Sequence, residues 1–162
     1  MEIINEPEIT ELEERTVACV SFVGNYVGKV EVFAELFGKL GNWAGPKQLI
    51  GPNTLFMSAY YGDPRVTPPE ELKLDACMTI NDDVEVEGEI KEQKLPGGKY
   101  VVMHAELTGA EEYVSAWENI VEWLMRNNLE IDMSRASYEI YLNDPEEHPE
   151  KHHILDICMP VK

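Results

Sequence analysis

The strongest constraint on the fold is an internal repeat. When the 162-residue chain is compared with itself at an offset of 81 residues, many identical residues align without a gap. The densest run ends in the motif Leu-Asp-x-Cys-Met, which occurs at 74–78 and again at 155–159. Such a run at one offset indicates duplication of one supersecondary unit rather than chance. We therefore predict a single domain over 1–162, made of pseudo-repeats 1–81 and 82–162.

Each repeat contains one segment with the apolar spacing i, i+3, i+4, i+7, which is typical of an amphipathic helix packed on a core. These segments are 29–43 and 110–127. The apolar residues expected to form the two stripes are Val30, Phe33, Ala34, Phe37 and Leu40 in the first segment, and Val114, Trp117, Ile120, Val121, Leu124 and Met125 in the second.

The remaining segments alternate with period 2, as strands do. The clearest are 72–80 and its copy 153–161, and the alternation also predicts strands at 16–23, 53–61, 98–106 and 135–142, with weaker ones at 7–12 and 88–94. Turn signals rich in Gly, Pro, Asn and Asp separate them. Each half is thus strand–strand–helix–strand–strand. We predict an α+β fold with an antiparallel sheet and two helices on one face.

Charge and cysteine content restrict the partners. The chain has 31 acidic and 13 basic residues, a formal charge of −18, which disfavours binding to nucleic acid or to anionic membranes. No apolar run is long enough to span a membrane, and the first residues lack the pattern of a signal peptide. Three cysteines lie far apart without a C-x-x-C pair. We expect a cytoplasmic protein with reduced thiols, and no direct nucleic-acid or membrane partner.

One carboxylate breaks the repeat, because Glu139 stands where the first half has Ser58. In 135–142 the more apolar alternate residues, such as Tyr138 and Ile140, are expected to face the helices, which would turn Glu139 away from them. The same strand parity assigns further residues to the face of Glu139, and these are Tyr141, Phe56, Tyr60, Tyr100 and His104. Aromatic walls around a partly desolvated carboxylate form the kind of pocket that suits a flat, hydrophobic, cationic molecule.

Other chemistry receives less support from the sequence. The four histidines are His104, His148, His152 and His153, and none of them lies in a helix at the i, i+4 spacing typical of a strong metal site. Residues 144–152 have the composition of a charged loop. We therefore expect no metal and no cofactor. A nucleophilic Cys–His pair stays open in principle, since Cys77, Cys158 and His104 are predicted to share a face, although buried cysteines are more often inert.

A series of motifs along nearly the whole chain resembles the GyrI-like (gyrase-inhibitor-like) small-molecule-binding family, also known as the effector-binding domain of AraC-type regulators. Their order and spacing carry the resemblance more than any single motif does. The motifs are Val23-Gly24-Asn25-Tyr26, Tyr60-Tyr61-Gly62-Asp63-Pro64, Leu95-Pro96-Gly97-Gly98-Lys99-Tyr100, Trp117 to Trp123-Leu124, Tyr138-Glu139-Ile140-Tyr141 and Cys158-Met159-Pro160-Val161.

The resemblance implies duplicated strand–helix–strand–strand modules with a ligand cleft between them, lined by aromatics and holding a functional glutamate. It assigns that role to Glu139 and adds Trp117 and Tyr26 to the candidate ligand-binding residues. The chain shows no helix-turn-helix segment, so direct control of transcription is not expected. The first motif reads Val-Gly-Asn-Tyr where the family often has Gly-Pro-Tyr.

Three hypotheses follow from these residues. The first is a stand-alone sensor or sequestering protein for hydrophobic, cationic aromatic compounds, with Glu139 as counter-ion. The second is a hydrolase of cyclopropane-containing or other electrophilic toxins, with Glu139 as catalytic carboxylate. The third is an acidic module that binds a basic protein partner, as the family's gyrase-inhibitor name suggests.

Overall fold

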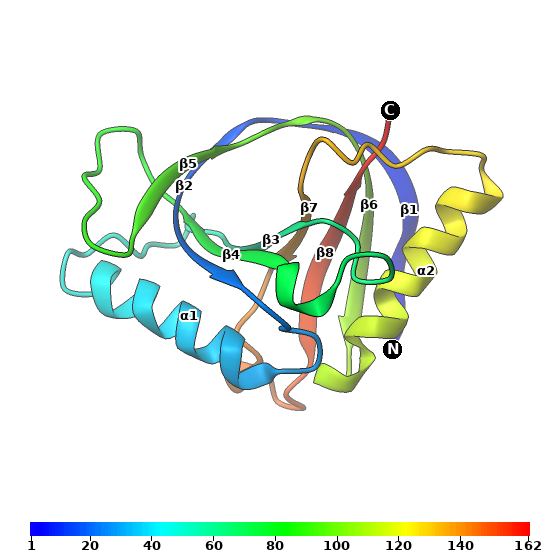
Figure 1. Ribbon diagram of the computed structural model, residues 1–162. Helices are drawn as coiled ribbons and strands as arrows, with labels where there is room; N and C mark the ends of the chain where they lie inside the picture. The colour runs from blue at the N-terminus through cyan, green and yellow to red at the C-terminus, as the bar shows by residue number, and fades with distance from the viewer. The chain divides into compact units, whose positions relative to one another are not determined.

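The computed structural model describes residues 1–162, and the chain divides into two compact units (Figure 1). One consists of Glu14–Pro96, and the other combines Met1–Glu13 with Gly97–Lys162. All strand pairs within each unit are antiparallel, and each unit carries one α-helix. The predicted α+β fold with antiparallel strands and two helices is therefore confirmed. Neither helix has the length and apolar content needed to cross a membrane.

The unit Glu14–Pro96 has its strands in the order β5-β2-β4-β3. Its elements are β2 (Arg15–Val23), α1 (Val30–Ala44), β3 (Phe56–Tyr61), the short 3-10 helix η1 (Pro69–Glu71), β4 (Lys73–Thr79) and β5 (Lys91–Leu95).

The other unit has its strands in the equivalent order β1-β6-β8-β7. Its elements are β1 (Glu2–Leu12), β6 (Gly98–Leu107), η2 (Ala110–Glu112), α2 (Tyr113–Arg126), β7 (Ser137–Tyr141), η3 (Pro145–Glu147) and β8 (His153–Pro160).

The compact units differ from the sequence repeats because the first strand of each repeat pairs with the other repeat. β1 pairs with β6, and β5 pairs with β2. Self-comparison of a sequence detects which segments are copies of one another. It does not show which neighbour a strand pairs with in the sheet. The repeat at an offset of 81 residues therefore could not predict that β1 and β5 each pair with a strand of the other repeat.

Each helix buries one row of residues spaced four apart. The row is Leu36, Leu40 and Ala44 in α1, and Ala116, Ile120 and Leu124 in α2. These rows pack on the alternating apolar residues of β2 and β4, and of β6 and β8. The predicted stripes were partly wrong: Ala34, in the middle of α1, is exposed. At the helix ends, the side chains of Val30, Val114 and Met125 are exposed too. All three lie in the first or last turn of a helix.

The strand register corrects the predicted orientation of β7. Residues directly opposite in an antiparallel pair place their side chains on the same face. Glu139 lies opposite Ile157, and Tyr141 lies opposite Leu155, and both partners belong to the core beneath α2. Glu139 therefore faces α2, and the prediction that it points away from the helices was wrong.

The equivalent strand β3 shows the same reversal. Ser58 lies opposite Ala76 and Tyr60 opposite Leu74, on the face covered by α1. Hydrophobic alternation failed in β7 because both faces of this strand are buried. Tyr138 is 1% exposed on one face and Glu139 3% exposed on the other. When both faces leave water, the more apolar set of residues no longer marks the helix side.

Candidate functional site

Glu139 is a buried carboxylate whose two oxygens each accept a hydrogen bond from an aromatic side chain. Trp117 Nε1 donates to Oε2 at 2.6 Å, and the Tyr141 hydroxyl donates to Oε1 at 2.8 Å. A buried ionised carboxylate is costly unless its oxygens find donors. Both donors are neutral, so they fix the position of the carboxylate and do not remove its negative charge.

Secondary structure brings the three side chains together. Glu139 and Tyr141 are two apart in β7, so they lie on one face of the strand. Trp117 lies on α2 beside the buried Ala116 and one turn before Ile120, and it packs against the same core. The indole therefore reaches Glu139 from the helix above. A helix-to-strand hydrogen bond of this kind requires Glu139 to face α2, as the register shows.

A tyrosine that the charge of this carboxylate influences forms a hydrogen bond with a histidine, and the sequence analysis selected neither for the site. Burial raises the pKa of Tyr113 well above its usual range, and the negative charge of Glu139 raises it further. The Tyr113 hydroxyl forms a 2.8 Å hydrogen bond with His153 Nδ1, and the two rings meet edge to face. Burial lowers the pKa of His153. A neutral hydroxyl that the charge of Glu139 influences thus has an imidazole beside it.

The unit Glu14–Pro96 carries its own aromatic cluster on the α1 face. The ring of Tyr26 lies 5.3 Å from that of Tyr60 and 6.2 Å from that of Phe33. Phe56 meets Phe37 at 6.4 Å, also edge to face. The structure therefore places the predicted residues Tyr26, Tyr60 and Phe56 on the helix side of their own unit.

Tyr100 and His104 do not join Glu139, because they lie on the opposite face of their strands. Tyr100 stacks on Tyr138 at 5.3 Å, and its hydroxyl donates to the backbone oxygen of Ala136. His104 Nδ1 lies 2.7 Å from a carboxylate oxygen of Asp156, its cross-strand neighbour. The predicted grouping of Tyr100 and His104 with Glu139 on one face was wrong, because it followed from the reversed orientation of β7.

Comparison with known proteins places this arrangement in context. A family model described as the GyrI-like small molecule binding domain matches residues 5–162. The SPbeta prophage-derived protein YosT of Bacillus subtilis (strain 168) is 36% identical over 124 residues, covering 75% of this chain and 78% of YosT. A DNA gyrase inhibitor of Pantoea sp. (strain At-9b) is 30% identical over 136 residues, covering 82% of this chain and 84% of the inhibitor.

Solved structures share the fold at low sequence identity. The C-terminal domain of EcmrR superposes with a TM-score of 0.76 at 15% identity, with 99% of both chains covered. SAV2435 bound to tetraphenylphosphonium gives 0.67 at 13% identity, covering 98% of this chain and 94% of SAV2435. A hydrolase encoded by lin2189 from Listeria innocua gives 0.64 at 14% identity, covering 97% and 92%.

Proposed function

Because this chain belongs to the GyrI-like small molecule binding domain family, and is therefore a small-molecule-binding domain, we propose that its ligands are hydrophobic organic cations and that Glu139 supplies the counter-charge. The observation that carries the proposal is the burial of the Glu139 carboxylate between Trp117 and Tyr141. A buried charge is retained against its desolvation cost only where something compensates it. A ligand cation is such a compensation.

The aromatic neighbours support the same ligand class. Indole and phenol rings offer apolar area and an electron-rich face that attracts cations. The side chains of Trp117 and Tyr141, which donate to the carboxylate, place such groups beside it. SAV2435, which shares the fold, was solved with tetraphenylphosphonium, a hydrophobic cation of four phenyl rings. That ligand was bound by SAV2435, and we use it as the test compound for this chain.

The decisive experiment compares two ligands of one shape and opposite charge. Tetraphenylphosphonium and tetraphenylborate have the same four-phenyl shape, so their difference in affinity isolates the charge. Two unit charges about 5 Å apart at an effective dielectric constant of about 20 attract by roughly 3 kcal/mol. Part of this is lost to desolvation. We expect Glu139→Gln to weaken tetraphenylphosphonium binding by about 10- to 100-fold.

Isothermal titration calorimetry measures both ligands against wild type and variant. Glu122→Gln, on the exposed side of α2, is the matched control for loss of one acidic charge. We expect Glu122→Gln to leave both affinities unchanged. We expect Glu139→Gln to lower the ratio of the affinity for tetraphenylphosphonium to that for tetraphenylborate. An equal loss of affinity for the cation and the anion in Glu139→Gln would refute the role of counter-ion.

A second candidate function is hydrolysis of an electrophilic ligand, such as a cyclopropane-containing toxin, at the same carboxylate. The Tyr113–His153 hydrogen bond favours it, because it holds a hydroxyl that the charge of Glu139 influences and that would serve as proton donor while Glu139 acts as general base. The hydrolase from Listeria innocua has the same fold. Under this hypothesis Glu139→Gln abolishes turnover of such a substrate while binding persists. Tight binding by wild type without product over hours would contradict it.

A further inference from the structure

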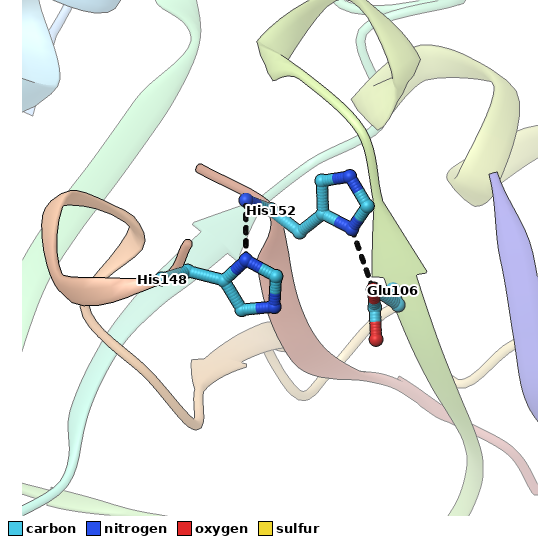
Figure 2. A group of neighbouring side chains, drawn as sticks. All are labelled: Glu106, His148 and His152. Carbon is cyan, nitrogen blue, oxygen red and sulfur yellow. Dashed lines mark hydrogen bonds and ion pairs between the residues drawn. The ribbon is translucent and has the colours of Figure 1, made fainter. Parts of the chain in front are cut away.

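A second group of potential ligand atoms lies apart from Glu139, where the loop between β7 and β8 meets the end of β6. One nitrogen from each of His148 and His152 and one oxygen of Glu106 all lie within 4.8 Å of one another. Figure 2 shows Glu106 reaching from β6 toward His152, with His148 on the loop beside it. All three side chains are half-buried.

The loop that carries the two histidines is held in place by its own hydrogen bonds. Asn143 donates from Nδ2 to the backbone oxygen of His152 and accepts from the backbone N–H of Ile154. Asp144 accepts from the backbone N–H of Glu146 and so caps η3. The rings of His148 and His152 consequently lie 4.9 Å apart and nearly parallel. Their proximity is set before any ligand arrives.

The two ring nitrogens of His152 have different surroundings. Nδ1 lies 2.5 Å from Glu106 Oε2, and Nε2 lies 3.2 Å from Glu150 Oε2. A metal-bound histidine commonly donates its second N–H to a carboxylate, which orients the ring and fixes the tautomer. With Nε2–H donating to Glu150, the short contact between Nδ1 and the Glu106 carboxylate holds one shared proton. A metal ion can replace that proton.

The other two groups are in a state that suits ligation. His148 Nδ1 accepts backbone N–H bonds from Glu150 and His152 at 3.1 and 3.3 Å, so this nitrogen carries a lone pair rather than a proton. A metal ion that binds this nitrogen takes the place of those two bonds. The carboxylate of Glu106 supplies an oxygen within 4.8 Å of the ligand nitrogens of both histidines.

We propose that Glu106, His148 and His152 form a binding site for a divalent transition-metal ion of the zinc class. Two imidazoles and one carboxylate are ligands that Zn²⁺, Ni²⁺ and Co²⁺ accept, and three protein ligands leave room for water. The carboxylate of Glu150, 3.2 Å from His152 Nε2, adds a favourable negative charge beside the site. A bound ion ties the β7–β8 loop to the end of β6. This site is independent of ligand binding at Glu139.

Isothermal titration calorimetry of Zn²⁺ into chelator-treated, tag-free protein tests the site directly. We expect one ion per chain, an affinity lowered at least 10-fold in His152→Ala and in His148→Ala, and a smaller rise in melting temperature with Zn²⁺ in these two variants than in wild type. Because the ligands must lose protons, the affinity should fall between pH 7.5 and pH 5.5. Glu147→Gln, an exposed carboxylate of the same loop, is the control and should bind as wild type does.

Visible absorption of the Co²⁺ form reports the ligands without relying on affinity. We expect a spectrum of nitrogen and oxygen ligation that changes in Glu106→Gln, a conservative variant whose far-ultraviolet circular dichroism should match wild type. Absence of a stoichiometric Zn²⁺ site, or unchanged affinity in folded His148→Ala and His152→Ala, would overturn the proposal. In that event the cluster serves only as a hydrogen-bond network of the loop.

Discussion

Replacing Trp117 with phenylalanine tests how strongly the buried carboxylate depends on its indole partner. The substitution removes the 2.6 Å donor to Glu139 Oε2 while leaving an aromatic ring on α2. Loss of a hydrogen bond to a charged group costs about 1.5–3 kcal/mol, and the smaller ring gives up about 1 kcal/mol of apolar burial. We expect the free energy of unfolding to fall by about 3 kcal/mol in total.

The same substitution made in Glu139→Gln separates these two contributions. A neutral amide oxygen accepts from an indole more weakly, with a net worth of about 1 kcal/mol. Trp117→Phe should therefore cost about 1 kcal/mol less in the Glu139→Gln background than in wild type. That difference is the coupling energy of a double-mutant cycle between contacting residues. It is independent of the loss of ring area, which is common to both backgrounds.

Urea unfolding followed by circular dichroism at 222 nm measures the four proteins, so that the assay does not depend on the tryptophan removed. Trp123→Phe provides the matched control, since Trp123 lies on the same helix and packs against the same core. It should cost the same in both backgrounds. If Trp117→Phe costs equally in both backgrounds, within about 0.3 kcal/mol, the hydrogen bond contributes nothing specific and the reasoning is refuted.

Three further predictions concern the stability of the unit that contains Glu139. Hydrogen bonds from Ser134, followed by Arg135, lower the pKa of Asp132 to about 2, so its contribution to folding stability is present above pH 4 and is lost as the pH falls toward 2. The difference in urea midpoint between wild type and Asp132→Asn should therefore shrink between pH 4 and pH 2. A difference that stays constant over this range would contradict the prediction. Arg135 also donates to three backbone carbonyls at 2.9–3.1 Å, so Arg135→Lys, which lacks the planar fork, should lower the free energy of unfolding by about 2 kcal/mol, checked by urea unfolding. Ile120 is fully buried on the core side of α2, and Ile120→Ala should cost about 2–5 kcal/mol in the same assay, whereas an effect below 1 kcal/mol would show that the core collapses around the gap.

The period-2 and 3.6-residue patterns located most elements, because most strands and helices have at least one apolar face that must leave water. For β1, which has no buried residue, they predicted only 7–12 of Glu2–Leu12. The predicted helix at 29–43 corresponds to Val30–Ala44, and the predicted strand at 16–23 to Arg15–Val23. Because the unit is duplicated, each element could be predicted from two copies of its sequence. Boundaries at the ends of the apolar stripes were less accurate, because residues in the terminal turns of the helices stay exposed.

The candidate site shows where such reasoning ends. Glu139 could be singled out because it breaks the repeat at Ser58. Strand parity also placed Tyr141 on its face, but the contact with Trp117 could not be derived in the same way, because Trp117 lies 22 positions away on another element and its contact depends on how β7 faces α2. Tyr113 and His153, 40 positions apart, had no pattern that would pair them. The same holds for Glu106 and His152, which are 46 apart.

The order of residues alone was therefore enough to identify the duplication, the succession of strands and helices and the antiparallel α+β class, and to single out Glu139 as a candidate. These depend on local periodicity and on identity between copies, both of which can be read along the chain. Two features needed the folded structure: the face on which each side chain of β7 lies, and the pairing of β1 and β5 with strands of the other repeat. The physical reason is that both faces of β7 are buried, so hydrophobicity gives no preference, and the cross-strand register alone sets the side on which Glu139 lies.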